Sequence, residues 1–212
     1  MKKGFTLSEV LIALAIIGIV AVLTLPTFLQ KHQRNVFVTQ LKKNYADLSL
    51  AFQKALVDGN APSVGETNIF QDGGETFLKK YFKVVDTCKN SDTTRCIDFS
   101  KYRTIGDGPI YITNDMLDEE SFTCSNLANG STLCLTTLAE GGDSFTCAIV
   151  DVNGAKDPNI AARDLFVMLV DNDGKVVPFP SSDNPYGRHG YSGVNEFSGF
   201  QYIYDDGWQM NY

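Results

Sequence analysis

An uncharged apolar segment near the N-terminus, Val10–Leu25, constrains this chain more than any other part of it. A helix rises about 1.5 Å per residue, so residues 5–25 would span roughly 30 Å, the thickness of a bilayer core. The small residue that could mark a processing site, Gly4, precedes this segment, whereas the cleavage site of a secretory signal peptide follows its apolar region. The sequence therefore predicts that cleavage removes a basic leader and leaves a membrane helix at the new N-terminus.

The start of the chain, Met1–Glu9, indicates what kind of leader this is. Its sequence Lys-Gly-Phe-Thr-Leu-Ser-Glu, followed by an apolar run, resembles the type IV prepilin leader, which type IV pilins share with the pseudopilins of type II secretion. The resemblance implies cleavage between Gly4 and Phe5 by a membrane-embedded prepilin peptidase, and N-methylation of Phe5. It also implies two further partners, other pilin or pseudopilin subunits and an inner-membrane assembly platform.

The charges on either side of the apolar segment bear on its orientation. Lys2 and Lys3 precede it, and the positive-inside rule then holds the N-terminus in the cytoplasm. Lys31, His32 and Arg34 follow it and weaken that argument. We favour the N-in orientation because the resemblance implies cleavage at the cytoplasmic face. The expected location is the bacterial inner membrane with the head outside, and then a surface pilus or a periplasmic pseudopilus.

Two residues of the predicted membrane helix are candidates for a role in assembly. A carboxylate in a membrane helix costs on the order of 2 to 3 kcal/mol if it lies deep, so Glu9 predicts a partner. The resemblance implies that this partner is the α-amino group of Phe5, on the same or a neighbouring subunit. The alternative is a first-turn acid that the helix dipole favours. Pro26 is expected to bend the helix or end it locally before it resumes, because proline removes a backbone hydrogen bond.

A second helical pattern follows the apolar segment. Apolar residues recur at steps of three and four along one predicted helix face, at Val38, Leu41, Tyr45, Leu48, Phe52 and Ala55. We interpret this stripe as packing on the protein's own sheet rather than as a groove for an external partner. Asp58-Gly59 reads as the helix end, with Gly59 free to take a left-handed conformation. The predicted organisation is a leader at 1–4, a helix at 5–58 with its membrane half at 5–25, and a head at 59–212.

The predicted head is α+β, with an antiparallel sheet packed on the long helix, which is the pilin fold that the resemblance implies. A short amphipathic helix is expected near 75–82 and a strand at 145–152. Asn172-Asp173-Gly174 predicts a hairpin between strands at 164–170 and 175–179. A last hairpin is expected over 200–210, around Asp205-Asp206-Gly207.

Five cysteines lie in the predicted head and none in the membrane helix. If the head lies outside the cytoplasm, disulfides are their expected use. Two bridges with one thiol left over allow fifteen arrangements. Loop size favours Cys88 with Cys96 and Cys124 with Cys134, and Cys147 is expected to be buried in a strand. Zinc is disfavoured because no pair has the tight spacing of zinc ligands.

No cofactor is expected, and calcium is the alternative that must be weighed. Asp151, Asn153 and Asp157 offer oxygen ligands near an Asn-Gly turn. Their spacing lacks the third acidic ligand of an EF-hand before its glycine, and also the closing glutamate. The three residues are therefore weak calcium candidates.

Charge and motifs disfavour nucleic-acid binding and catalysis. Up to Lys43 there are six Lys or Arg against one acid, a net of +5, and from Asn44 on there are twelve against twenty-four, a net of −12. An acidic head is not expected to bind nucleic acid. No G-x-S-x-G elbow, P-loop, H-E-x-x-H or dinucleotide motif is present. We therefore expect no enzyme.

Two functions fit these features. The first is a structural subunit that assembles through its N-terminal helix into a type IV pilus or a type II secretion pseudopilus. The second is a low-copy minor pilin whose disulfide-bonded head acts as an adhesin or ligand-binding module.

Overall fold

The computed structural model divides the chain into two compact units, Met1–Val36 and Phe37–Tyr212, which are described separately below. Of residues 90, 91, 137–140 and 143–145 the structure describes the backbone alone. The structure describes residue 4 and residues 6–70, 72–110, 112, 122–140, 143–179 and 198–212.

Helix α1, Leu7–Gly59, contributes to both units. It contains Pro26 without ending there, so the helix continues through the proline rather than stopping and resuming. The end of α1 corrects one detail of the prediction. Asn60, rather than Gly59, takes the left-handed conformation, with φ 46°. The Asn60 amide donates to the carbonyl of Val57 and the Ala61 amide to that of Leu56, the Schellman arrangement that satisfies the last carbonyls.

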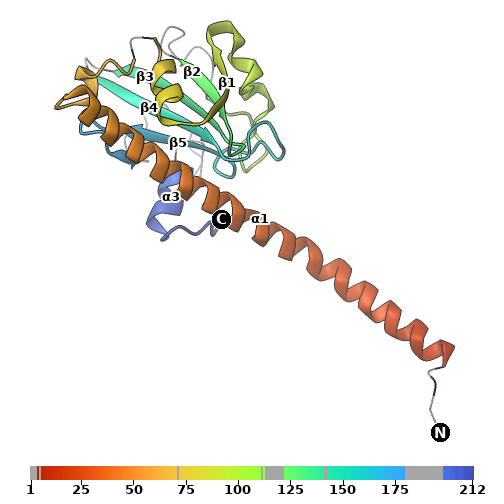
Figure 1. Cartoon of the computed structure of the whole chain (residues 1–212). Helices are drawn as coiled ribbons and strands as arrows, with labels where there is room; N and C mark the ends of the chain where they lie inside the picture. Colours follow the sequence, from red (N-terminus) through yellow and green to blue (C-terminus); the bar gives the residue numbers. More distant parts are fainter. Residues whose placement is uncertain are drawn as a thin grey trace. The chain divides into compact units, whose positions relative to one another are not determined.

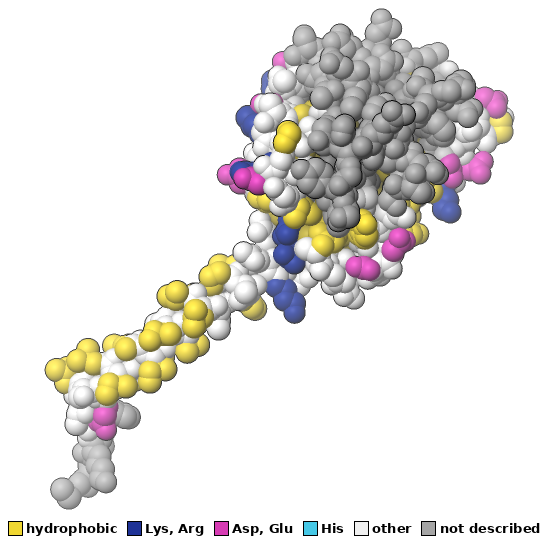
Figure 2. Space-filling model, turned by 180° about the vertical axis from the view of Figure 1, so that it is seen from behind, with side chains coloured by type: hydrophobic (Ala, Val, Ile, Leu, Met, Phe, Trp, Pro, Cys, Tyr) yellow, Lys and Arg dark blue, Asp and Glu magenta, His cyan; other side chains and the backbone are white. Residues whose placement is uncertain are grey.

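The N-terminal unit exposes its apolar side chains. The large apolar residues between Leu7 and Leu29 are each 44–79% exposed, and apolar side chains cover the visible face of this part of α1 (Figure 2). Among the described residues, α1 is the one helix long and apolar enough to cross a membrane. In lipid these side chains would lie in the medium that their transfer energies favour, whereas in water they would remain exposed.

The Phe37–Tyr212 unit, called the head below, is built on a six-stranded antiparallel sheet in which neighbours along the chain are also neighbours in the sheet (Figure 1). The strands are β1 Val84–Lys89, β2 Thr123–Leu127, β3 Thr132–Glu140, β4 Asp143–Asp151, β5 Leu165–Val170 and β6 Val176–Pro178. Two short helices accompany them, α2 Glu75–Tyr81 and α3 Gly199–Asp205. The α+β architecture with an antiparallel sheet after a long helix is confirmed.

Helix α1 packs on one face of the sheet through the predicted stripe. Leu41, Leu48 and Phe52 are fully buried, and Tyr45 is partly buried against the same cluster. Phe166 and Met168 of β5 belong to this cluster, since alternate residues of a strand face the same side. A buried polar contact also links α1 to the turn that joins two strands of the sheet. The side-chain oxygen of Asn44 accepts hydrogen bonds from Asn129 at 3.0 Å and Ser131 at 3.2 Å, both in the turn between β2 and β3.

The other face of the sheet carries a second hydrophobic cluster. Residues of opposite parity on the same strands point there, including Ile149 on β4 and Val167 on β5. The segment between β1 and β2 covers them with Ile97, Phe99 and Tyr102. The sheet is therefore buried on both faces, with helix on one side and irregular chain on the other.

The hairpin between β5 and β6 is confirmed. Asp171 accepts a hydrogen bond from the backbone of Lys175 at 2.8 Å and closes the turn. Gly174 has φ +72°, and a Cβ on it would lie 2.9 Å from Leu56 Cδ1 of α1. Glycine is therefore required here both by the backbone conformation and by the close approach of α1.

The last predicted hairpin is wrong, because residues 199–205 form α3. Phe200 and Ile203 are three residues apart, lie on one helix face and are fully buried. Phe200 packs against Tyr45 and Trp208 with ring centroids 5.6 and 6.0 Å apart. Gly207, with φ +67°, ends the helix rather than turning a hairpin, and the Trp208 amide donates to the carbonyl of Ile203 at 2.8 Å.

Candidate functional site

The candidate site is the N-terminal start of α1, where Thr6 and Glu9 cap the helix reciprocally. The Thr6 amide donates to Glu9 Oε2 at 2.8 Å, and the Thr6 hydroxyl donates to the same oxygen at 2.7 Å. The Glu9 amide in turn donates to Thr6 Oγ1 at 3.3 Å. This is a capping box, in which a Thr and a Glu three residues on satisfy each other's free backbone amides. Phe5, the residue predicted to become the new terminus, lies outside the described residues.

The capping box gives the Glu9 carboxylate a function within its own chain. It binds backbone and side-chain donors at the positive end of the helix dipole, as the first-turn interpretation expects. The spacing Thr-x-x-Glu is a recognisable sequence signal for such a cap, and the sequence interpretation did not use it. The role of Glu9 toward the α-amino group of Phe5 stays a prediction.

Gly4 is exposed, and the space around it would also accommodate a larger residue. A Cβ built on it would meet nothing within 4 Å. Glycine at this position is therefore not explained by packing in the folded chain.

The segment around Pro26 contains two threonines that bind back to the helix backbone. Thr24 Oγ1 donates to the carbonyl of Val20 and Thr27 Oγ1 to that of Thr24, both at 2.9 Å. Such hydroxyl bonds let polar side chains lie in an apolar helix without unsatisfied donors. They allow this part of the helix to remain apolar on its outside.

The cysteines pair as loop size favours. Cys88 is bonded to Cys96 and Cys124 to Cys134. Both bridges lie in the cluster on the sheet face opposite α1. Cys147 on β4 is a free, buried thiol, and burial raises its pKa to about 12. It is therefore protonated at neutral pH and a poor nucleophile.

The three weak calcium candidates lie around one turn after β4, which hydrogen bonds within the chain hold together. The side-chain oxygen of Asn153 accepts no hydrogen bond from the described residues. Asp151 is buried and accepts hydrogen bonds from the hydroxyl of Tyr102 and, at 3.0 Å, from the amide of Asn153. The Asn153 side-chain amide donates to the carbonyls of Lys156 at 2.7 Å and Asp157 at 3.1 Å. These bonds close the turn within the protein, and calcium binding there stays a prediction.

Asp151 belongs to a buried acidic group that the sequence did not predict. Burial is the main cause that raises the pKa of Asp151 to about 7, and the neighbouring Asp164 carboxylate contributes to this rise. Burial also raises the pKa of Asp164 to about 6, although the amides of Asn159 and Ile160 donate to it at 2.8 and 2.7 Å. Tyr102 is far from both aspartates in the sequence, so no local pattern indicated the group.

The apolar helix that leads into an antiparallel α+β head defines a pilin-like architecture. Residues 1–25 match the family model of the prokaryotic N-terminal methylation motif, the signature of type IV pilins and pseudopilins. The recognised resemblance is therefore confirmed over the leader and the apolar part of α1. Neither the comparison with curated proteins nor that with solved structures gives a match. The motif and the apolar helix fit a pilin-like structural subunit anchored in the inner membrane.

Proposed function

We propose that this chain is a pilin-like subunit, cut after Gly4, methylated on Phe5 and assembled through α1 into a type IV pilus or a type II secretion pseudopilus. The match of residues 1–25 to the methylation motif is the observation that carries the proposal. The motif is followed by an apolar helix segment with exposed side chains. After this segment comes a head with a hydrophobic cluster on each face of its sheet. The partners would be a prepilin peptidase, other subunits and the inner-membrane assembly platform.

The surroundings of Gly4 support cleavage there. The residue is exposed and lies outside α1, which begins at Leu7. A protease needs extended, accessible backbone, and a helix would hide the scissile bond in its own hydrogen bonds. Cleavage at this point would remove Lys2 and Lys3 and leave the capping box intact.

The geometry of the capping box also supports a contact between Glu9 and the new amino group. Glu9 Oε2 lies 2.8 Å from the Thr6 nitrogen. Covalent bond lengths keep the Phe5 nitrogen within about 4 Å of the Thr6 nitrogen. A small rotation of the Glu9 side chain would then exchange a hydrogen bond from a neutral amide for one from the charged amine, of its own or a neighbouring subunit.

Mass spectrometry of the mature protein from membranes and sheared filaments tests the proposal. The expected mass corresponds to a chain that begins at Phe5 and carries one added methyl group. A Gly4→Leu variant should remain at the precursor mass. Gly18→Ala is the matched control, since a Cβ at Gly18 also meets nothing within 4 Å. A wild-type mass that includes residues 1–4, or normal processing of Gly4→Leu, would refute the assignment.

A further inference from the structure

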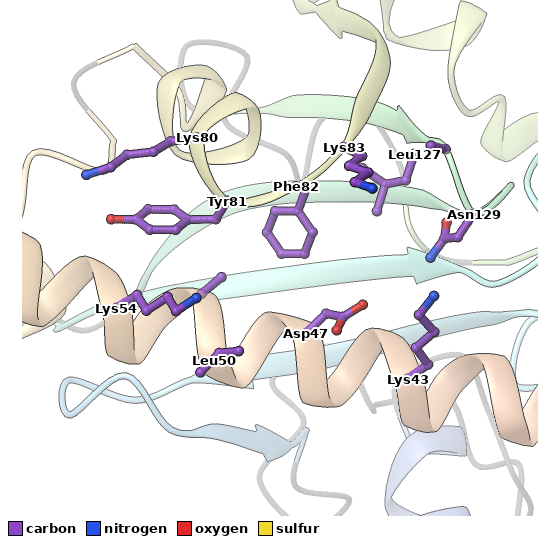
Figure 3. Close-up of a pocket in the computed structure, with 12 residues that line it drawn as sticks. Lys43, Asp47, Leu50, Lys54, Lys80, Tyr81, Phe82, Lys83, Leu127 and Asn129 are labelled. Atoms are coloured by element: carbon purple, nitrogen blue, oxygen red, sulfur yellow. The ribbon is translucent and has the colours of Figure 1, made fainter.

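A groove of about 620 Å³ lies in the head on one side of α1. Lys43, Asp47, Leu50 and Lys54 of α1 form one wall, as Figure 3 shows. The opposite wall is formed by residues 80–83 at the end of α2 and by residues 127–129 at the end of β2. Leu50, Phe82 and Leu127 provide apolar surface between the charged side chains.

The groove is basic although the head as a whole is acidic. Of the residues that the structure describes, four lysines line it, Lys43, Lys54, Lys80 and Lys83, together with one acid, Asp47. Lys80 forms an ion pair with Asp58 at 2.6 Å. Among the residues that the structure describes, Lys43, Lys54 and Lys83 take part in no direct ion pair. Lys54 nevertheless interacts electrostatically with Asp58, so the groove offers a net positive charge beside apolar surface. Such a surface suits an acidic partner with apolar or aromatic side chains.

A surface of that chemistry lies on the other side of α1 in the same head. Tyr202 and Tyr204 of α3 are 43% and 40% exposed, and Asp205 and Asp206 follow them at the helix end. Asp173 is exposed in the turn between β5 and β6. We call this surface the acidic flank; it consists of Tyr202, Tyr204, Asp205, Asp206, Asp171 and Asp173. Lys42 and Lys175 also lie there, so the carboxylates outnumber the cations.

The contacts of α1 place the two surfaces on different sides of the helix. At 100° per residue, the α1 residues that line the groove, which include Ala51, span about 100° around its axis. Lys42, Tyr45 and Gln53 lie about 110° to 170° from the middle of that span. Lys42 lies over the ring of Trp208 at 5.4 Å, and Tyr45 packs against Tyr204 at 6.0 Å. Gln53 donates to the carbonyl of Asp173 at 2.9 Å. In Figure 3, accordingly, α3 lies on the side of α1 away from the groove.

The charges on the two surfaces also match in their positions along α1. Tyr204 and Trp208, which flank Asp205 and Asp206 in the sequence, contact Tyr45 and Lys42, so we infer that the two aspartates lie near this level of α1. The backbone carbonyl of Asp173 lies at the level of Gln53. Lys43 and Lys54 lie at these same two levels on the groove side, roughly 16 Å apart. One head placed beside another would therefore bring two positive positions against two negative ones.

We propose that the basic groove of one head binds the acidic flank of a second copy of the chain. This contact presupposes the filament subunit proposed above and specifies which head surfaces meet. The two surfaces are different and lie on different sides of the molecule, so the contact is heterologous. A heterologous contact repeats from subunit to subunit and, where its rotation does not close a ring, produces an open helical filament.

Charge reversal in the full-length chain tests the contact in its native host. A Lys43→Glu, Lys54→Glu variant should enter sheared filaments about tenfold less than wild type, because like charges would then face each other. An Asp173→Lys, Asp205→Lys variant should show a similar loss. The chain with all four changes should recover to within about threefold of wild type, since the charges are again complementary. Lys101→Glu with Lys156→Glu, both exposed and outside the two surfaces, is the matched control.

The mature mass of every variant separates this contact from the proposed function. Normal cleavage and methylation, with loss of incorporation only in the two reversed variants, supports the contact. Full incorporation of the groove variant overturns it. A loss that the fourfold variant does not restore also overturns it, because the groove would then serve a different partner. Failure of wild type to be processed or to form filaments would instead count against the proposed function.

Discussion

At the scale of single residues, Glu9 has one observed interaction and one predicted interaction, and experiments can separate the two. One is the capping box with Thr6, which the structure contains. The other is the predicted ion pair with the amino group of Phe5. A cap needs a Thr and a Glu together, whereas an ion pair needs only the carboxylate.

Two substitutions distinguish these interactions. Glu9→Leu should permit processing and membrane insertion but abolish most filament incorporation, because the amine of Phe5 would lose its counter-charge. Thr6→Val removes the hydroxyl of the cap and costs about 1 kcal/mol of local helix stability, but it leaves the carboxylate in place. It should assemble nearly as well as wild type. Quantitative blotting of sheared filaments measures both. Equal loss in the two variants would show that capping, rather than the ion pair, is what assembly requires.

The buried carboxyl groups of Asp151 and Asp164 are also a residue-scale feature, and they predict a pH dependence. Burial raises both pKa values in the folded head, to about 7 and about 6, whereas an unfolded aspartate has a pKa of about 3.9. Between these values the folded state binds more protons than the unfolded state. Stability contributed by this group is therefore present at low pH and is lost as the pH rises through 6 and 7.

The head should accordingly be more stable at pH 5 than at pH 7.5, by roughly 1 to 3 kcal/mol. Urea unfolding of the full chain in detergent measures this, with fluorescence of the single tryptophan, Trp208, as a probe of the head. Carboxylates with lowered pKa, such as Asp58 and Glu75 beside lysines, oppose the trend only below about pH 4 to 5. Asp151→Asn should flatten the profile. An equally steep rise in stability with falling pH in that variant would sink the assignment.

At the scale of elements, sequence patterns that depend on residues close together in the chain predicted the secondary structure correctly. The stripe from Val38 to Ala55 predicted the packed face of α1, and Asn172-Asp173-Gly174 predicted the β5–β6 hairpin. The segment 200–210 was mistaken for a hairpin because aromatic residues and an Asp-Gly pair suggest strands. Its helical form depends on Phe200 and Ile203 packing against Tyr45, a contact between distant segments.

The distinction between local sequence patterns and contacts between distant segments also applies to the candidate sites. The leader, Gly4 and Glu9 are contiguous and could be recognised from the sequence, and the matched motif covers them. Tyr102 and Asp151 are 49 residues apart, and the groove joins α1 to the ends of α2 and β2. Only the tertiary fold brings such residues together, so periodicity and spacing contain no signal for them.

The β5–β6 turn provides an element-scale prediction. Gly174→Ala should destabilise the head by more than about 2 kcal/mol, because its positive φ strains an L-residue and its Cβ would press on Leu56. Gly130→Ala is the matched control. Its φ is also positive, +87°, but a Cβ there meets nothing within 4 Å, so it should cost only about 1 to 2 kcal/mol. Urea titrations followed by Trp208 fluorescence compare them. Equal losses would show that the contact with α1 contributes nothing.

At the scale of the whole molecule, charge, membrane orientation and cysteine chemistry are linked. The basic residues Lys2 and Lys3 precede the apolar segment, and Lys31 and Arg34 follow it. Both disulfides lie in the head. Disulfides form outside the cytoplasm and are reduced inside it. The oxidation state of the head therefore reports on which side of the membrane it lies.

The number of free thiols can therefore be used to measure the membrane orientation of the intact chain. Lys2→Glu with Lys3→Glu reverses the charge before the span while Lys31 and Arg34 keep theirs, so the positive-inside rule then favours an inverted insertion. Lys31→Glu with Arg34→Glu should have the opposite effect and increase the fraction of heads outside. Acid quenching, denaturation and labelling with a maleimide polymer count the thiols on a gel. A correctly oriented chain should label once, at Cys147, whereas an inverted chain should label at all five cysteines. A single label in every variant would contradict control of orientation by these charges, and five labels in wild type would contradict an extracytoplasmic head.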